Sequence, residues 1–334
     1  MTRILVIGPG ALGIPTAIRL HNAGHDVLLA VRNKEKAERL EAIGLTMTAP
    51  DGGQETATVA CVHDPAQLAD VPVDLLIHTT KCSVAADVLR HWLAALAPDG
   101  HVIPFQNGLM AGELQPIAGD RYVECSVYWP ATLTKVGHSH MTGPGHQVLG
   151  PYPKGEPGPE HQELARLLGA VTPTEAHADM QAVKWSKLTL NSAMTCLGVA
   201  TGATMREMMA HKPTRAAFLA VIREGLAVMA AQGIQPVAIG NSKPGLLSRL
   251  PDPVAHLVLR LLARKYGDYR SSSTQSLARG EPTEVPYLNG VIVAAGQEYG
   301  VATPVNAGLV EAVARVEAGQ VKSGFGLVEQ VMGA

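Results

Sequence analysis

Three glycines near the N-terminus constrain the fold more than any other feature of this sequence. Gly8, Gly10 and Gly13 have the spacing G-x-G-x-x-G and follow four consecutive apolar residues, 4–7. An uninterrupted apolar run is typical of a parallel strand that is covered on both faces. In this pattern Gly8 permits a tight turn, Gly10 lets backbone approach a pyrophosphate, and Gly13 lets a helix pack closely on the strand. The stretch therefore predicts a strand, a phosphate-binding turn and a helix over 11–23.

The turn itself is predicted to hold the phosphates, because free N–H groups and the helix dipole favour an anion at a helix N-terminus. The predicted cofactor-binding residues of the turn are consecutive: Gly8, Pro9, Gly10, Ala11, Leu12 and Gly13. Gly24 ends the helix, and a second apolar strand over 27–31 follows at the distance expected of a strand–helix–strand unit. This context disfavours the alternative of a glycine-rich turn without a ligand.

The end of the second strand indicates which dinucleotide is bound. A site for NAD usually carries Asp or Glu here, which accepts a hydrogen bond from the ribose 2′-hydroxyl. This strand leads instead into Arg32, followed by Lys34 and Lys36. A guanidinium forms charge-assisted hydrogen bonds with a 2′-phosphate, so Arg32 predicts NADP(H), with Lys34 or Lys36 adding charge. The alternative is that Lys34, Lys36 and Arg39 form only a solvated helix face, which suits Lys36 and Arg39 better than Arg32.

Composition excludes several classes of protein. The 334 residues are 46% hydrophobic and 4% aromatic, with a formal net charge of −2. This length predicts about two domains, and the charge and scarce aromatics argue against nucleic-acid binding. The N-terminal apolar run is interrupted by glycines and Pro9, unlike a signal peptide, and we expect no membrane association and a cytoplasmic location. The four cysteines are widely spaced, which favours reduced thiols over a disulfide framework or a zinc site.

Short strands and helices continue to about residue 175. The pattern predicts these elements in chain order: a helix over 33–40, a hairpin of 45–48 and 56–62, a strand over 74–78, a helix capped by Ser83, strands over 102–105, 122–128 and 147–149, and a helix over 160–168. His138 and His140 would share one face of a strand, but no third ligand is evident, so no metal is expected.

Polar residues follow two of the predicted buried strands. Lys81 comes after strand 74–78, and Asn107 comes after strand 102–105. Ligands bind outside the carboxyl ends of such strands, so both residues are predicted to lie on the same rim as the glycine turn. Lys81 would place a cation beside the cofactor or a substrate carboxylate, unless it is only solvated. Asn107 would bind ligand, or serve only an Asn-Gly turn.

Beyond residue 178 the pattern changes to long helices. Helical spacing extends over 182–197, 215–232, 253–266, 284–299 and 304–318. We therefore predict an α/β dinucleotide-binding domain over 1–178 and an all-α domain for substrate binding and dimerisation over 179–334. In a protein of this build the active site is expected in the cleft between the domains.

One helix carries a polar stripe. Lys187, Asn191 and Thr195 are spaced i, i+4, i+8 and so lie along one helical face. A lysine and an amide suit a substrate carbonyl, whereas the alternative is a solvated helix face. A second polar cluster over 270–275 precedes Glu284, which has an adequate structural role as a carboxylate near a helix N-terminus.

These motifs together resemble the ketopantoate reductase (2-dehydropantoate 2-reductase) family over almost the whole chain. The resemblance rests on seven features: GPGALG at Gly8–Gly13, Arg32 after the second strand, TTK ending at Lys81, QNG containing Asn107, KWSKLTLN containing Lys187 and Asn191, SSSTQ containing Ser272, and TEVPYLNG…YGVATPVN containing Glu284. It implies a Rossmann-type domain followed by a helical domain like the C-terminal domain of 6-phosphogluconate dehydrogenase.

The resemblance also implies an oxidoreductase that reduces a 2-oxo acid with NADPH, converting 2-dehydropantoate to pantoate in pantothenate biosynthesis. Hydride transfer leaves charge on the carbonyl oxygen, which requires a nearby cation and proton donor. The implied catalytic residues are Lys187 and Glu284. The expected substrate-binding residues are Asn107, Asn191, Thr195 and Ser272, while Lys81, Asn107 and Glu284 are also expected to contact the cofactor. A homodimer is expected only because symmetric dimers are the commonest oligomers.

Four positions depart from the family's usual residues. Thr195 stands where a second asparagine is common, Pro286 where an acid is common, and Tyr128 and Trp129 where smaller residues are expected. These positions surround the substrate more than the cofactor. Two alternatives therefore stay open: a reductase or dehydrogenase for another 2-oxo or 2-hydroxy acid, and a non-catalytic NADP-binding sensor, which the presence of Lys187 disfavours.

Overall fold

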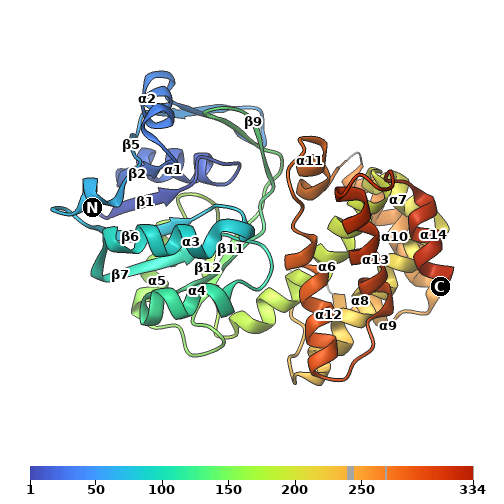
Figure 1. Cartoon of the computed structure of the whole chain (residues 1–334). Helices are drawn as coiled ribbons and strands as arrows, with labels where there is room; N and C mark the ends of the chain where they lie inside the picture. Colours follow the sequence, from blue (N-terminus) through green and yellow to red (C-terminus); the bar gives the residue numbers. More distant parts are fainter. Residues whose placement is uncertain (239–243, 268, 334) are drawn as a thin grey trace. The chain divides into compact units, whose positions relative to one another are not determined.

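Figure 1 shows the computed structural model of the chain, which describes residues 1–238, 244–267 and 269–333. The side chains of residues 262, 264–266 and 272 also lie outside this description. The chain divides into two compact units, Met1–Gln181 and Ala182–Ala334. This division lies three residues beyond the predicted boundary at residue 178.

The first unit is built on a parallel sheet with the strand order β5-β2-β1-β6-β7. The strands are β1 (Arg3–Ile7), β2 (Asp26–Ala30), β5 (Ala60–Val62), β6 (Val73–His78) and β7 (Leu96–Pro104). Ile4, Leu5 and Val6 are fully buried, which explains their uninterrupted apolar sequence. Strands β2 and β5 follow β1 in the chain and lie on one side of it in the sheet. The later strands β6 and β7 lie on the other side of β1. The switch point of this doubly wound sheet therefore lies between the carboxyl ends of β1 and β6.

Helices cover the sheet, as the sequence predicted for an α/β unit (Figure 1). They are α1 (Gly13–Asn22), α2 (Lys34–Ile43), α3 (Cys82–Trp92), α4 (Ala111–Ala118) and α5 (Pro159–Leu168). α1 starts two residues later than predicted because the glycine turn extends to Leu12, and it ends before Gly24, which has φ 90°. The predicted Ser83 cap is wrong: α3 begins at Cys82 with Lys81 at the N-cap, so Ser83 lies inside the first turn.

Two smaller sheets complete the first unit. One has the order β4-β3-β10-β9, from β3 (Leu45–Thr48), β4 (Gln54–Ala57), β9 (Ala131–Lys135) and β10 (His138–Met141). The other has the order β12-β11-β8, from β8 (Glu124–Val127), β11 (Gln147–Gly150) and β12 (Thr174–Ala176). The predicted hairpin exists between β3 and β4, but its second strand over 56–62 is wrong. That segment divides into β4 and β5, which belong to different sheets.

The second unit is helical in the part that the structure describes, as predicted. Its α-helices are α6 (Met180–Thr201), α7 (Met205–Ala210), α8 (Lys212–Ala231), α9 (Pro244–Arg249), α10 (Asp252–Tyr266), α11 (Ser272–Ala278), α12 (Asn289–Glu298), α13 (Pro304–Glu317) and α14 (Phe325–Gly333). The predicted continuous helix over 284–299 is wrong at its start. Residues Val285–Tyr287 form a 3₁₀ turn, η4, and the backbone of Leu288, with φ −114° and ψ −88°, interrupts it before α12.

The two units bury separate hydrophobic cores. The first core joins sheet residues such as Ile4 and Ile77 to helix residues such as Ile14 and Ile18. The second gathers α6, α8 and α13 around residues such as Leu197 and Ile222. Among the described residues, none of the helices combines the length and the apolar character that a membrane span requires.

Candidate functional site

The conformation of the glycine turn requires glycine at two of its three glycine positions, Gly8 and Gly13. Gly8 has φ +104°, in the region that side chains disfavour. A Cβ on Gly13 would lie 2.0 Å from the carbonyl oxygen of Gly8, whereas a Cβ on Gly10 would meet no described atom within 4 Å. The turn is therefore tight at Gly8, closely packed at Gly13 and open at Gly10. This geometry suits a phosphate group that approaches the backbone at Gly10.

The loop after β6 packs directly on this turn. The Thr79 hydroxyl lies 2.9 Å from the carbonyl oxygens of both Ile7 and Gly8, and donates its hydrogen bond to them. The methyl group of Thr80 lies 3.1 Å from the point that a Cβ on Gly8 would occupy. The two loops at the switch point therefore form one surface at the carboxyl edge of the sheet.

Lys81 and Asn107 lie on this edge, each half-buried. Lys81 is the N-cap of α3, and the next residue, Cys82, donates a hydrogen bond from its thiol to the Asn107 carbonyl oxygen at 3.4 Å. The structure thus brings together the loops after β1, β6 and β7, as the strand ends predicted. It places these backbone segments side by side without assigning a ligand to either side chain.

Two supporting residues of this edge escaped the sequence reasoning. His78 ends β6, is fully buried, and places Nε2 2.8 Å from the Thr80 Oγ1. Burial lowers the pKa of His78 to about 4, so its ring is uncharged near neutral pH. Ser139 on β10 donates a hydrogen bond to the Ala11 carbonyl oxygen at 2.7 Å and so supports the glycine turn from the second sheet. A histidine directly after the apolar run 75–77 of β6 was the available signal for His78.

Arg32 lies exposed just beyond β2, where the adenosine ribose of a dinucleotide is expected. The pKa of Lys36 is lowered, mainly by partial burial and to a smaller extent by the positive charge of the neighbouring Arg32. Lys34 instead lies 3.7 Å from Glu38 in an exposed ion pair. Of the two lysines proposed to add charge, Lys36 is therefore the one in the electrostatic field of Arg32, and Lys34 faces a carboxylate.

In the second unit, the polar stripe of α6 forms as its spacing predicted. The Thr195 hydroxyl donates a hydrogen bond to Asn191 Oδ1 at 3.1 Å. Lys187 and Asn191 are half-buried, while Thr195 is buried. The stripe is therefore not the fully solvated helix face that was the alternative. Thr195 engages the amide oxygen of Asn191 and so orients the amide group.

The polar cluster before α12 packs on the same face of α6. A Cβ on Gly198 would lie 3.0 Å from Thr274 Oγ1 and 3.2 Å from Ser271 Oγ, so α11 begins against the end of the stripe. Ser273 Oγ accepts a hydrogen bond from the Glu284 backbone N–H at 3.2 Å. Glu284 is half-buried and immediately precedes η4. The side chain of Ser272 lies outside the described residues, although its backbone begins α11.

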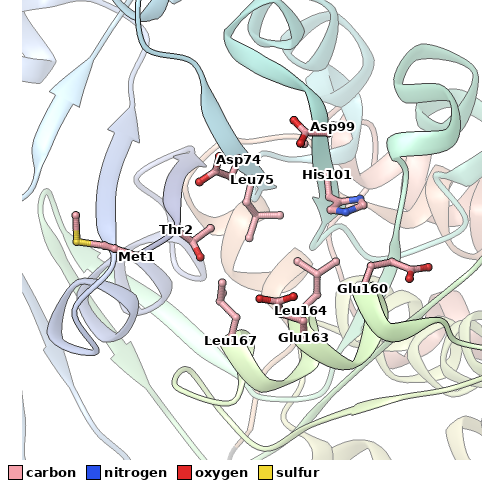
Figure 2. A pocket seen from close by; sticks show the side chains of 11 residues that line it. Met1, Thr2, Asp74, Leu75, Asp99, His101, Glu160, Glu163, Leu164 and Leu167 are labelled. Atoms are coloured by element: carbon pink, nitrogen blue, oxygen red, sulfur yellow. The ribbon is translucent and has the colours of Figure 1, made fainter.

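A cavity of about 250 Å³ lies elsewhere in the first unit (Figure 2). Asp74 and His101 line it from β6 and β7, and Glu160 and Glu163 line it from α5. Asp74 lies near the amino end of β6, and His101 lies in the middle of β7. The glycine turn lies at the opposite, carboxyl end of the sheet. The cavity is therefore separate from the candidate cofactor site. The described residues contain no group of three or more His, Cys, Asp or Glu side chains that would hold a metal ion.

Comparisons with known proteins agree with this geometry. Residues 4–154 match the family model for ketopantoate reductase PanE/ApbA, and residues 179–317 match the model of its C-terminal domain. The 2-dehydropantoate 2-reductase of Caulobacter vibrioides is 32% identical over 318 residues, which cover 93% of this chain and 97% of that protein. The chain belongs to the ketopantoate reductase family. Relatives with this name are oxidoreductases that act on CH–OH groups.

Solved structures show the same fold. A PanE/ApbA family ketopantoate reductase from Ralstonia eutropha JMP134 superposes with a TM-score of 0.80 and 26% identity, covering 95% of this chain and 99% of that one. D-mandelate dehydrogenase, solved with NADH and anilino(oxo)acetate, gives a TM-score of 0.81 at 23% identity, with 95% and 99% coverage. The two-domain Rossmann-type and helical architecture is thus the family's architecture.

Proposed function

We propose that this protein reduces a 2-oxo acid with NADPH, and that 2-dehydropantoate is the substrate. The observation that carries the proposal is the stripe of Lys187, Asn191 and Thr195 on α6, in a chain that belongs to this family. A carbonyl that gains a hydride needs a cation and a proton donor at its oxygen, and an oriented amide beside it. The stripe offers both within two turns of one helix.

The proposed roles follow from the chemistry of each residue. The bound cofactor supplies the hydride. The Lys187 ammonium stabilises the developing charge on the carbonyl oxygen and donates the proton to it. Asn191, held by Thr195, and Ser272 bind the substrate, while Glu284 accepts a hydrogen bond from a substrate hydroxyl and orients Lys187. Asn107 is proposed to contact substrate and cofactor from its own unit.

NADP(H) is the proposed cofactor because of the charges after β2. Arg32 takes the position at which an acidic residue would select NAD, and Lys36 lies in its field. Two neighbouring cations are stabilised by a dianion such as the 2′-phosphate. NADH in the structure of D-mandelate dehydrogenase makes NAD the alternative to be tested. The glycine turn serves either nucleotide, since both contain the pyrophosphate, and Lys81 is proposed to contact either one.

A bulkier 2-oxo acid is the second candidate substrate. The bridge between Val102 and Tyr122 is parallel, so the chain leaves β8 toward the same edge at which β7 ends. Tyr128 follows β8 and stacks on His146, with ring centroids 4.6 Å apart. An aromatic pair at this edge favours an apolar substituent on the substrate. Trp129, by contrast, is a core residue of the first unit, and its size carries no information about the substrate.

The test is NADPH oxidation with 2-dehydropantoate, beside aliphatic and aromatic 2-oxo acids and a parallel series with NADH. Turnover of 2-dehydropantoate with NADPH in preference to NADH is expected, and would support a place in pantothenate biosynthesis. Turnover of phenylglyoxylate only would favour the second candidate. Tight NADPH binding without turnover of any 2-oxo acid would contradict both and favour a sensor. A cytoplasmic location and a homodimer are further proposals, the latter testable by analytical ultracentrifugation.

A further inference from the structure

We propose that the side-chain hydroxyl of Thr80 donates a hydrogen bond to a phosphate oxygen of the bound dinucleotide, and that the buried ring of His78 positions this hydroxyl. The inference rests on the proposed function only in requiring a dinucleotide at the glycine turn. It does not depend on which 2-oxo acid is reduced.

Thr80 is held at both its backbone and its side chain. Its carbonyl oxygen accepts a hydrogen bond from Gln106 Nε2 at 3.0 Å. Its Oγ1 lies 2.8 Å from His78 Nε2, and its methyl group faces Gly8. Because both branches of Cβ are engaged, the side chain is fixed in one rotamer beside the phosphate-binding turn. It is half-buried there, unlike the fully buried histidine beneath it.

The direction of the His78–Thr80 hydrogen bond follows from the other ring nitrogen. A neutral imidazole carries one N–H donor and one acceptor nitrogen. His78 Nδ1 is buried without a hydrogen-bond partner among the described residues, and its strand neighbours are Ile7 and Pro104, which have apolar side chains. A buried N–H without an acceptor is costly and rare, so the proton is assigned to Nε2. Nε2–H therefore donates to Thr80 Oγ1.

This assignment leaves the proton of the Thr80 hydroxyl available to another acceptor. The neighbouring Thr79 has no such freedom, because its hydroxyl already donates to the carbonyl oxygens of Ile7 and Gly8. The acceptor expected beside Gly8 is an oxygen of the pyrophosphate. Since the pyrophosphate is common to NADPH and NADH, Thr80 strengthens the binding of both, in contrast to Arg32.

Four variants test the proposal through the dissociation constants of NADPH and NADH, measured by nucleotide fluorescence. Thr80→Val keeps the shape and removes the donor, and should weaken both nucleotides about tenfold or more, as for a hydrogen bond to a charged group. His78→Leu should have a similar effect. His78→Gln keeps an amide N–H near the position of Nε2 and should restore binding to within about threefold of the wild type. The double variant H78L/T80V should bind no more weakly than T80V.

A matched control is Thr174→Val, which removes a hydroxyl that donates to the Thr172 carbonyl oxygen at 2.8 Å in another sheet of the same unit. It should leave both dissociation constants unchanged. NMR of the protein with isotope-labelled histidine should show His78 with its proton on Nε2, the signal being identified by its loss in H78Q.

Nucleotide binding by T80V within twofold of the wild type would overturn the phosphate contact. Additive losses in the double variant, or a proton on His78 Nδ1, would overturn the positioning role of the histidine. Nucleotide binding without turnover of any 2-oxo acid would overturn the proposed reaction and leave this inference standing. A wild-type protein that binds neither nucleotide would overturn both.

Discussion

Acid should destabilise the first unit through His78 in particular. The ring is fully buried between neutral strand neighbours, and burial lowers its pKa from 6.5 to about 4. The unfolded chain therefore binds a proton more readily than the folded chain, so the stability that the neutral ring confers is complete above about pH 6.5 and is lost as the pH falls toward about 4. Within this window, each fall of one pH unit lowers the free energy of unfolding by about 1.4 kcal/mol. Acidification from about pH 7.5 to about pH 5 should thus remove about 2 kcal/mol from the free energy of unfolding.

Urea unfolding of the wild type and of His78→Gln measures this contribution. Both proteins should carry Trp185→Phe, so that the remaining tryptophans, Trp92 and Trp129, report on the first unit. Other histidines whose pKa burial lowers, such as His101, are present in both proteins, and their contributions cancel in the difference. The wild type should lose about 2 kcal/mol more than H78Q over this pH range. A difference between the two proteins that does not change with pH would refute the buried neutral ring.

Three substitutions test the remaining parts of the site. Arg32→Ala should weaken NADPH about tenfold to a hundredfold with little effect on NADH, as measured by titration, while Arg39→Ala on the exposed face of α2 serves as control; equal losses for both nucleotides would contradict the NADP assignment. Lys187→Ala should lower kcat about 10²–10⁴-fold at saturating substrate, and near-normal turnover would remove it from the acid role. Gly13→Ala should lower the free energy of unfolding by about 1–3 kcal/mol and weaken nucleotide binding, because its Cβ would collide with the Gly8 carbonyl oxygen. An unchanged melting temperature and an unchanged affinity would show that the turn rearranges to accept the methyl group.

The first strand–turn–helix could be predicted from sequence because all of its determinants are local. The apolar run of β1, the glycine spacing and Gly24 after α1 are contiguous, and the structure confirms each as an element. Segment 56–62 failed because its alternation predicts extended backbone but not the partner strand. β4 pairs with β3, whereas β5 pairs with β2 in the main sheet. The choice of sheet depends on tertiary packing, which a local pattern does not contain.

The second unit shows the same limit at its candidate site. The stripe of Lys187, Asn191 and Thr195 followed from helical spacing, and the hydrogen bond between the last two confirms that they share a face. The packing of α11 against Gly198 joins residues about seventy positions apart, and no periodicity indicates it. The prediction of one helix over 284–299 was wrong. The apolar residues keep a helical spacing through η4 and into α12, but the backbone of Leu288 is not helical and separates the two elements.

The structure also explains why a glycine motif needs the neighbouring strands to become a binding site. Thr79 fixes the carbonyl oxygen of Gly8, Gln106 fixes that of Thr80, and Cys82 hydrogen-bonds to that of Asn107. Side chains from the loops after β6 and β7 thus hold one another and the glycine turn through backbone carbonyl oxygens. A substitution in one of these loops should therefore change the position of the others, because each of the three hydrogen bonds joins loops that follow two different strands. The site is a property of the switch point as a whole, which is why the sequence motif alone is weak and its place in the sheet is decisive.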